Sequence, residues 1–136
     1  MRIFLGANVL FSAARSDGAV RQLLNLRFAA RHELWADGYV AKEARCNLAS
    51  KALAGLIDFA ALLVRLHLEP AQGLVESIPA AMPLPEKDRP VLVAAMRLGC
   101  EALVTGDRAH FGRFYGRTLG GVMIHSPRSL AEALLL

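Results

Sequence analysis

The chain has 136 residues, of which 54% are hydrophobic and 21% are charged, and its formal net charge is +4. This length is sufficient for one domain with a buried core, and two distant cysteines, Cys46 and Cys100, exclude a zinc knuckle or a disulfide framework and favour a reducing cytoplasm. The positive charge permits nucleic-acid binding without indicating it, and the high apolar content favours an oligomer.

The first predicted element is a short β-strand at residues 2–5 (RIFL). The next residues, 6–8 (GAN), are turn-prone and predict a loop. This N-terminal segment resembles a signal peptide superficially, but a glycine and an asparagine interrupt its apolar run, so we expect a soluble cytoplasmic protein. Apolar residues then recur at helical spacing over residues 18–28, which predicts an amphipathic helix.

A second strand is predicted at residues 33–36, followed by Asp37 as the N-cap of a helix over residues 39–50 that contains Glu43. Residues 52–66 are nearly all apolar and predict a helix that serves as a packing element. A glycine and an aspartate interrupt this run below the roughly 18 apolar residues that a membrane span requires. No membrane-spanning segment is therefore expected.

Three prolines within residues 74–85 exclude a continuous helix there. Asp88 then stands at the entrance of a helix over residues 90–98, and strands are predicted at residues 102–105 and 122–125. A serine-proline pair after the last strand starts a C-terminal helix. Because strands alternate with helices, we predict an α/β fold with a central, mainly parallel sheet and helices on both faces.

Polar side chains follow two of the predicted strands where each strand ends. Asn8 comes after the first strand, and Thr105 and Asp107 come at the end of a later one. Ligands bind beyond the carboxyl ends of the strands in open parallel sheets, because loops and helix starts converge there. We expect Asp88 and Glu43 to reach the same edge of the sheet from their helices.

The sequence is similar to the PIN-domain ribonuclease family, in particular to bacterial toxins of the VapC type. The resemblance rests on four stretches in the family's order: MRIFLGANVLFS (1–12), YVAKEARCNL (39–48), LPEKDRPVLVAAMRL (84–98) and ALVTGDRAHF (102–111). The last strand and serine-proline helix also match the family's ending. The resemblance implies a single PIN-like three-layer domain over residues 1–136. It also implies a cytoplasmic, metal-dependent endoribonuclease that forms a homodimer and is neutralised by a protein antitoxin.

By position in these stretches, Glu43, Asp88 and Asp107 match the family's metal-binding and catalytic acids. Clustered carboxylates repel each other unless a cation lies between them, and Mg²⁺ or Mn²⁺ is the expected ion. Such an ion activates a bound water and stabilises charge on a phosphate during hydrolysis of the RNA. Asn8 and Thr105 match polar residues of the family and are expected either to support the metal ligands or to position substrate.

Residues outside the acidic set have weaker assignments. Arg108, with Arg113 and Arg117, is a candidate contact to RNA phosphates, and a solvated basic loop is an equal alternative. His110 is left out of the catalytic set, because a lone histidine is more often a surface or packing residue. The nearby aromatic residues and Trp35 are expected to pack in the core.

One position departs from the family pattern. The family has a metal-binding aspartate at the end of the first strand, and this chain has Gly6 there, which supplies no side-chain ligand. Activity could therefore be reduced or absent, and a catalytically silent module that binds RNA or an antitoxin is the alternative function. An unrelated small-molecule-binding domain is disfavoured because no glycine-rich phosphate loop follows any predicted strand.

Overall fold

A computed structural model of the protein describes residues 1–72 and 84–135, and the proline-rich prediction at 74–85 lies almost entirely outside these residues. The described chain contains a six-stranded sheet in the order β3-β2-β1-β4-β6-β5. Its strands are β1 (Arg2–Leu5), β2 (Glu33–Asp37), β3 (His67–Glu69), β4 (Ala102–Val104), β5 (Thr118–Leu119) and β6 (Val122–His125). All neighbouring strands pair in parallel except β5 and β6, which are antiparallel.

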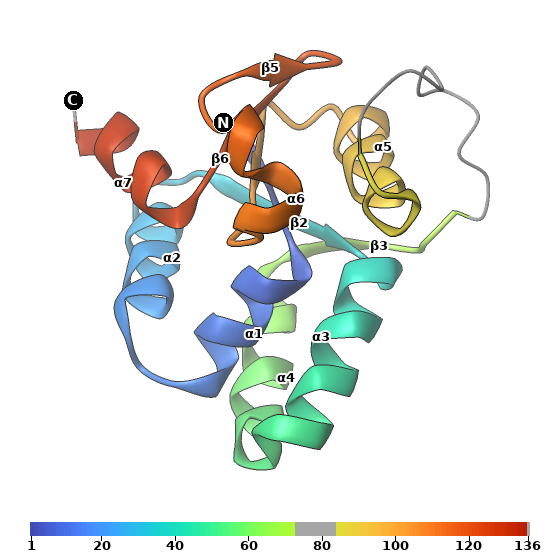
Figure 1. The fold of residues 1–136 in the computed structure, drawn as a ribbon. Helices are drawn as coiled ribbons and strands as arrows, with labels where there is room; N and C mark the ends of the chain where they lie inside the picture. Colours follow the sequence, from blue (N-terminus) through green and yellow to red (C-terminus); the bar gives the residue numbers. More distant parts are fainter. Residues whose placement is uncertain (73–83, 136) are drawn as a thin grey trace.

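Helices cover both faces of this sheet, as predicted (Figure 1). Helices α1, α3 and α4 contact one another on one side, and α5 contacts β4 and β6 from the other side. The helices are α1 (Ala7–Arg15), α2 (Ala19–Ala29), α3 (Gly38–Lys51), α4 (Leu56–Arg65), α5 (Arg89–Arg97), α6 (Arg108–Phe111) and α7 (Pro127–Leu135). The arrangement is the three-layer α/β architecture that the alternation of strands and helices predicts.

The core lies between the sheet and its two helical layers. The central strands are buried on both faces, which is why they read as continuous apolar runs without alternation. Large side chains from strands and helices fill this space and are less than 2% exposed: Ile3, Phe4, Leu5, Leu10, Leu24, Leu34, Leu48, Phe59, Leu92, Leu103, Ile124 and Leu130. None of the described helices combines the length and apolar character needed to cross a bilayer.

Several helix starts and stops follow from local sequence. Asp37 caps α3 by accepting a hydrogen bond from the Val40 N–H, as predicted. Pro90 lies in the first turn of α5, where its missing N–H is not needed. Gly99 ends the same helix with a φ of +67°, a backbone conformation that glycine adopts at little cost.

Two local predictions were wrong, and two short strands were not predicted. Residues 6–8 are not a loop, because α1 begins at Ala7 directly after β1, with Gly6 as its N-cap. The predicted helix over residues 52–66 is divided into a 3₁₀ turn (Leu53–Gly55) and α4, and the chain then forms the unpredicted edge strand β3. The two-residue strand β5 was also not predicted. Its length is too short to produce a visible alternation of apolar and polar residues.

Candidate metal centre

The candidate site lies at the carboxyl ends of β1 and β4, which are neighbours at the centre of the sheet. The chain proceeds from β1 outward to β2 and β3 on one side, and β4 and β6 lie on the other side. Such a reversal of strand order opens a crevice beyond the strand ends. The β1 and β4 ends are joined there by a backbone hydrogen bond of 2.9 Å from Gly6 N–H to Val104 O.

A pocket of about 80 Å³ occupies this crevice. It brings together residues that are distant in sequence, including all three predicted acids. The lining residues are Gly6, Ala7, Asn8, Glu43, Asn47, Lys87, Asp88, Val91, Thr105, Asp107 and Phe111. Five of the six predicted site residues therefore line one pocket, and the sixth, Arg108, is an exposed residue at the start of α6 that does not line it.

Asp88 is the most deeply placed acid, with 9% of the residue exposed. It is the last residue of a short 3₁₀ turn (Glu86–Asp88) and the N-cap position of α5. Burial raises the pKa of its carboxyl, the neighbouring His110 opposes that rise, and Asp107 adds to it. The Tyr39 hydroxyl donates a hydrogen bond of 2.6 Å to the Lys87 carbonyl, which fixes the turn that carries Asp88.

Asp107 is held by the loop that follows β4. Its backbone N–H donates to the Thr105 hydroxyl at 3.1 Å, and its Oδ1 accepts the His110 N–H at 3.2 Å as the N-cap of α6. Asn8 holds the same loop from α1, because its Oδ1 accepts the Gly106 N–H at 3.0 Å. Asn8 and Thr105 therefore position the loop that carries Asp107.

His110 is the residue that sequence reasoning left out. Its Nδ1 lies 2.7 Å from Asp88 Oδ2 and 2.9 Å from Asp107 Oδ2, so the ring lies between the two carboxylates. Despite these short contacts, Asp88 Oδ2 and His110 Nδ1 are buried without a properly angled hydrogen bond among the described residues. The sequence did contain one indication of this role. His110 is three residues after Asp107, and residues three apart in a helical turn share a face.

This cluster fits a metal ion. Ligand atoms of Asp88, Asp107 and His110 all lie within 4.8 Å of one another, and one of the carboxylate oxygens is buried without a hydrogen-bond partner. Carboxylate oxygens and imidazole nitrogens are common ligands of divalent cations. Among the described residues these three form the cluster of ligating side chains that could hold one ion.

Glu43 lies at the solvent side of the pocket. It is an exposed residue of α3 and is not among the three side chains whose ligand atoms converge. Its negative charge still acts on the site, because Glu43 and Asp88 both raise the pKa of Tyr39, after the larger effect of that residue's burial. The structure thus places Glu43 in the same pocket as the other two acids, but at its rim.

Gly6 lies at the base of the pocket in an extended conformation, with φ −70° and ψ 162°. Any residue can adopt this backbone geometry. A Cβ at this position would meet Val104 O at 3.2 Å and the Thr105 Cβ at 3.5 Å. A side chain here fits after a small adjustment and would start beside the other pocket residues.

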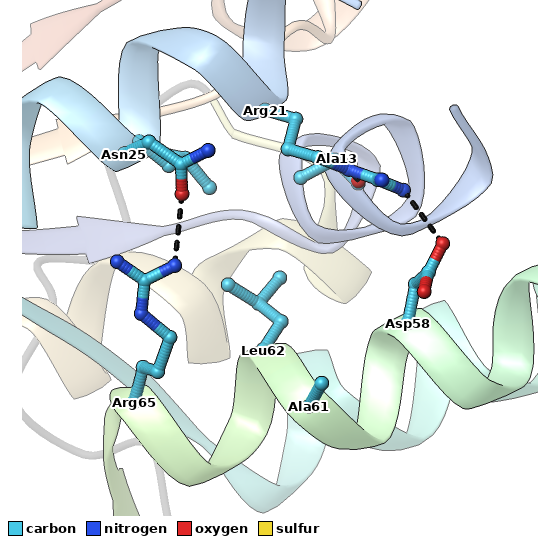
Figure 2. A pocket seen from close by; sticks show the side chains of 8 residues that line it. Ala13, Arg21, Asn25, Asp58, Ala61, Leu62 and Arg65 are labelled. Carbon is cyan, nitrogen blue, oxygen red and sulfur yellow. Dashed lines mark hydrogen bonds and ion pairs between the residues drawn. The ribbon is translucent and has the colours of Figure 1, made fainter. Parts of the chain in front are cut away.

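A second, larger pocket of about 190 Å³ lies between α1, α2 and α4 and has no comparable chemistry (Figure 2). Its polar side chains bond to one another: Arg21 forms an ion pair with Asp58 at 3.0 Å, and Arg65 donates to the Asn25 amide oxygen at 2.8 Å. Arg21 also donates to the Ala13 carbonyl at 2.6 Å. These contacts link α2 to α4 and to α1.

Neither a protein-family model nor a curated protein sequence matches the chain. Solved structures do match. A chain of VapBC2 from Rickettsia felis, crystallised with a DNA fragment from the promoter, is 16% identical with a TM-score of 0.70, over 93% of this chain and 98% of that one. VapC20 of Mycobacterium tuberculosis, a toxin that cleaves the sarcin-ricin loop, is 12% identical with a TM-score of 0.58, over 79% and 92%. The protein therefore has the PIN-like α/β fold of the VapC toxin structures.

Proposed function

We propose that the protein is a metal-dependent endoribonuclease of the toxin-antitoxin type. The observation that supports this most strongly is the convergence of Glu43, Asp88 and Asp107 on one pocket at the carboxyl ends of β1 and β4. Three acids from separate elements have no folding role that requires them to share a pocket, since like charges there destabilise the fold. A cation held by Asp88 and Asp107, with the Glu43 carboxylate beside it in the same pocket, explains this arrangement.

The expected cation is Mn²⁺ or Mg²⁺, which activates a water and neutralises charge on a phosphate when bound. Asp88 and Asp107 are the residues of the acidic set that would hold it, and Asn8 and Thr105 fix the loop that orients Asp107. Glu43 supplies a carboxylate at the open side of the pocket, where substrate would enter. Lys87 also lines the pocket and can contact a phosphate.

RNA is the proposed substrate. VapC20 cleaves an RNA loop, and this chain shares its fold. The formal net charge of +4 attracts a polyanion. Arg108, Arg113 and Arg117 are exposed in the segment after Asp107 and are candidates for contacts to the phosphate backbone.

Metal removal tests this proposal directly. The purified chain is incubated with labelled single-stranded RNA in Mn²⁺, in Mg²⁺ and after treatment with EDTA. We expect cleavage with a metal ion, a loss of at least about 100-fold with EDTA, and recovery when Mn²⁺ is returned, because the ion supplies the nucleophile. Cleavage that EDTA leaves unchanged, and that is lost in Asp107→Asn and so comes from this chain, would contradict metal dependence.

A catalytically silent module that binds RNA or an antitoxin is the second candidate function. Gly6 favours it, because the end of β1 offers no carboxylate to the pocket. One experiment distinguishes the nuclease from the silent module. Retention of labelled RNA without cleavage in any divalent metal supports the silent module, and cleavage excludes it.

We also propose two protein partners, an antitoxin and a second copy of the chain. The antitoxin rests on the similarity to a chain of the VapBC2 complex. The second copy rests on α4, where Ile57 and Val64 are 82% and 85% exposed. They are seven residues apart and share a helix face, and Leu53 in the preceding turn is also exposed. Such an apolar stripe is typical of an association surface.

Introducing charge into this stripe is expected to disrupt the dimer. The wild-type chain should elute in size-exclusion chromatography with light scattering as a dimer of the 14.7 kDa chain, and Ile57→Asp with Val64→Asp should elute as a monomer. An aspartate at the centre of an apolar interface is left unpaired and desolvated. Leu26→Asp, at an exposed position of α2, is the matched control and should remain dimeric. A monomeric wild-type chain would refute the homodimer.

A further inference from the structure

We infer that His110 is a metal ligand of this site and replaces the carboxylate that Gly6 lacks, so that the site prefers a transition-metal ion to Mg²⁺. The inference rests on the proposed metal-dependent function and specifies the chemistry of its centre. It differs from the sequence-based prediction, which assigned Glu43, Asp88 and Asp107 as the ligands and left His110 out.

The first support is the separation of the atoms. The Nδ1 of His110 lies 2.7 Å from one carboxylate oxygen and 2.9 Å from the other. Two ligands at adjacent corners of an octahedron, each about 2.1 Å from the ion, are about 3.0 Å apart. The nitrogen therefore already lies at the spacing of adjacent ligands from each of the two oxygens, and the ligand atoms of all three residues lie within 4.8 Å of one another.

The second support is that the deepest ligand has no other function in the described structure. Asp88 is 9% exposed, and its Oδ2 has no properly angled hydrogen bond among the described residues, although it faces the Nδ1 of His110. The contact with His110 offsets part of the desolvation cost of this carboxylate oxygen, and the missing hydrogen-bond geometry leaves the rest uncompensated. A cation held between this oxygen, Asp107 Oδ2 and the imidazole nitrogen removes that cost for all three atoms.

The third support is that the ring is attached to the loop that carries Asp107. Asp107 Oδ1 accepts the His110 backbone N–H, which leaves Asp107 Oδ2 directed at the ring of His110. The turn of α6 therefore presents a carboxylate and an imidazole together, and Asp88 approaches from the start of α5. This arrangement supplies three ligands without any side chain at Gly6.

The ligand set determines which ion is favoured. Mg²⁺ is bound by oxygen ligands, whereas imidazole suits Zn²⁺, Co²⁺, Ni²⁺ and related ions. Two carboxylates and one imidazole therefore favour Mn²⁺, Co²⁺ or Zn²⁺ over Mg²⁺. An all-carboxylate centre would discriminate less strongly, because it lacks the nitrogen ligand.

The test is metal binding, measured by calorimetry and by the visible absorption of bound Co²⁺, with no RNA present. The wild-type chain should bind one Co²⁺ at least about 10-fold more tightly than Mg²⁺. His110→Asn should lower Co²⁺ affinity at least about 10-fold, change the Co²⁺ spectrum and leave Mg²⁺ affinity within about 3-fold, because only the nitrogen ligand is lost. His67→Asn, which removes an exposed histidine on β3, is the matched control and should leave Co²⁺ affinity and spectrum unchanged.

Two other results would overturn the inference in different ways. If His110→Asn retains or increases Co²⁺ affinity while Asp107→Asn loses it, then His110 bridges the carboxylates without binding the ion, and the metal-dependent function still stands. If neither variant changes the affinity for Co²⁺ or Mn²⁺, then this pocket is not the metal site, and the proposed function fails as well. Far-UV circular dichroism and thermal unfolding of each variant establish that lost binding is not lost folding.

Discussion

Replacing Asp107 with asparagine is expected to lower RNA cleavage at least about 100-fold and to weaken Mn²⁺ binding by at least about 10-fold. The substitution removes the negative charge and turns Oδ2, which faces His110 at 2.9 Å, into an amide nitrogen that cannot bind a cation. The remaining amide oxygen can still accept the His110 N–H, so the start of α6 is preserved. The loss is therefore chemical, and the measurement is cleavage rate against Mn²⁺ concentration.

The design of this variant separates chemistry from stability. Asparagine and aspartate are about equally good N-caps, so the free energy of unfolding should change by less than about 1 kcal/mol. Asp17→Asn is the matched control, because Asp17 is an exposed acid that does not line the pocket, and it should retain wild-type cleavage. Equal cleavage by Asp107→Asn and Asp17→Asn would exclude Asp107 from the reaction.

Restoring a carboxylate at the end of β1 should have the opposite effect. In Gly6→Asp we expect Mn²⁺ affinity to rise at least about 10-fold, RNA cleavage to rise with it, and the preference among metals to shift toward Mg²⁺, since the new ligand is oxygen. The backbone at Gly6 is extended and tolerates any residue. The contact of the new Cβ with the backbone oxygen of Val104, at 3.2 Å, costs about 1–3 kcal/mol of stability.

The same substitution predicts a metal-dependent change in stability. Without a divalent ion, a further carboxylate beside Asp88 and Asp107 adds repulsion and should lower the midpoint of thermal unfolding. With Mn²⁺ the midpoint should rise by more than it does in the wild-type chain, because ligand binding stabilises the native state.

Gly18→Asp is the matched control for this variant. Gly18 is also an N-cap glycine with negative φ, it precedes α2, and it does not line the pocket. This control carries the same charge change and should leave Mn²⁺ affinity and cleavage unaltered. If Gly6→Asp also leaves both unaltered, a carboxylate at the end of β1 does not reach the metal, and the comparison with the family's first aspartate fails.

Strong local patterns predicted most of the fold. The apolar runs of β1, β4 and β6, the Asp37 cap and the stop at Gly99 were read correctly, because each is decided by neighbouring residues. The start of α1 was missed because glycine and asparagine are common in turns, whereas here Gly6 serves as an N-cap. The edge strand β3 was missed because its three residues form a strand only through pairing with β2.

The candidate site, like the fold, was predictable from the sequence only in part. The order of the acidic residues along the chain was sufficient to predict that Asp88 and Asp107 would meet, since strand ends and helix starts of a parallel sheet converge at one edge. The sequence could not show that Glu43 would remain at the rim, or that the ring of His110 would lie between two carboxylates. Those relations depend on distances between side chains of α3, α5 and α6, which are set by how the helices pack on the sheet.

The sequence by itself therefore determined the α/β architecture, the positions of the acids and the absence of a carboxylate at Gly6, because these follow from residue identity and local periodicity. Only the tertiary structure decided which side chains share the pocket and which lie at ligand distance from one another. The distances between the ligand atoms of Asp88, Asp107 and His110 depend on how the start of α5 lies relative to α6. A local sequence pattern cannot predict them. The position of the His110 ring between two carboxylates is therefore known only from the structure.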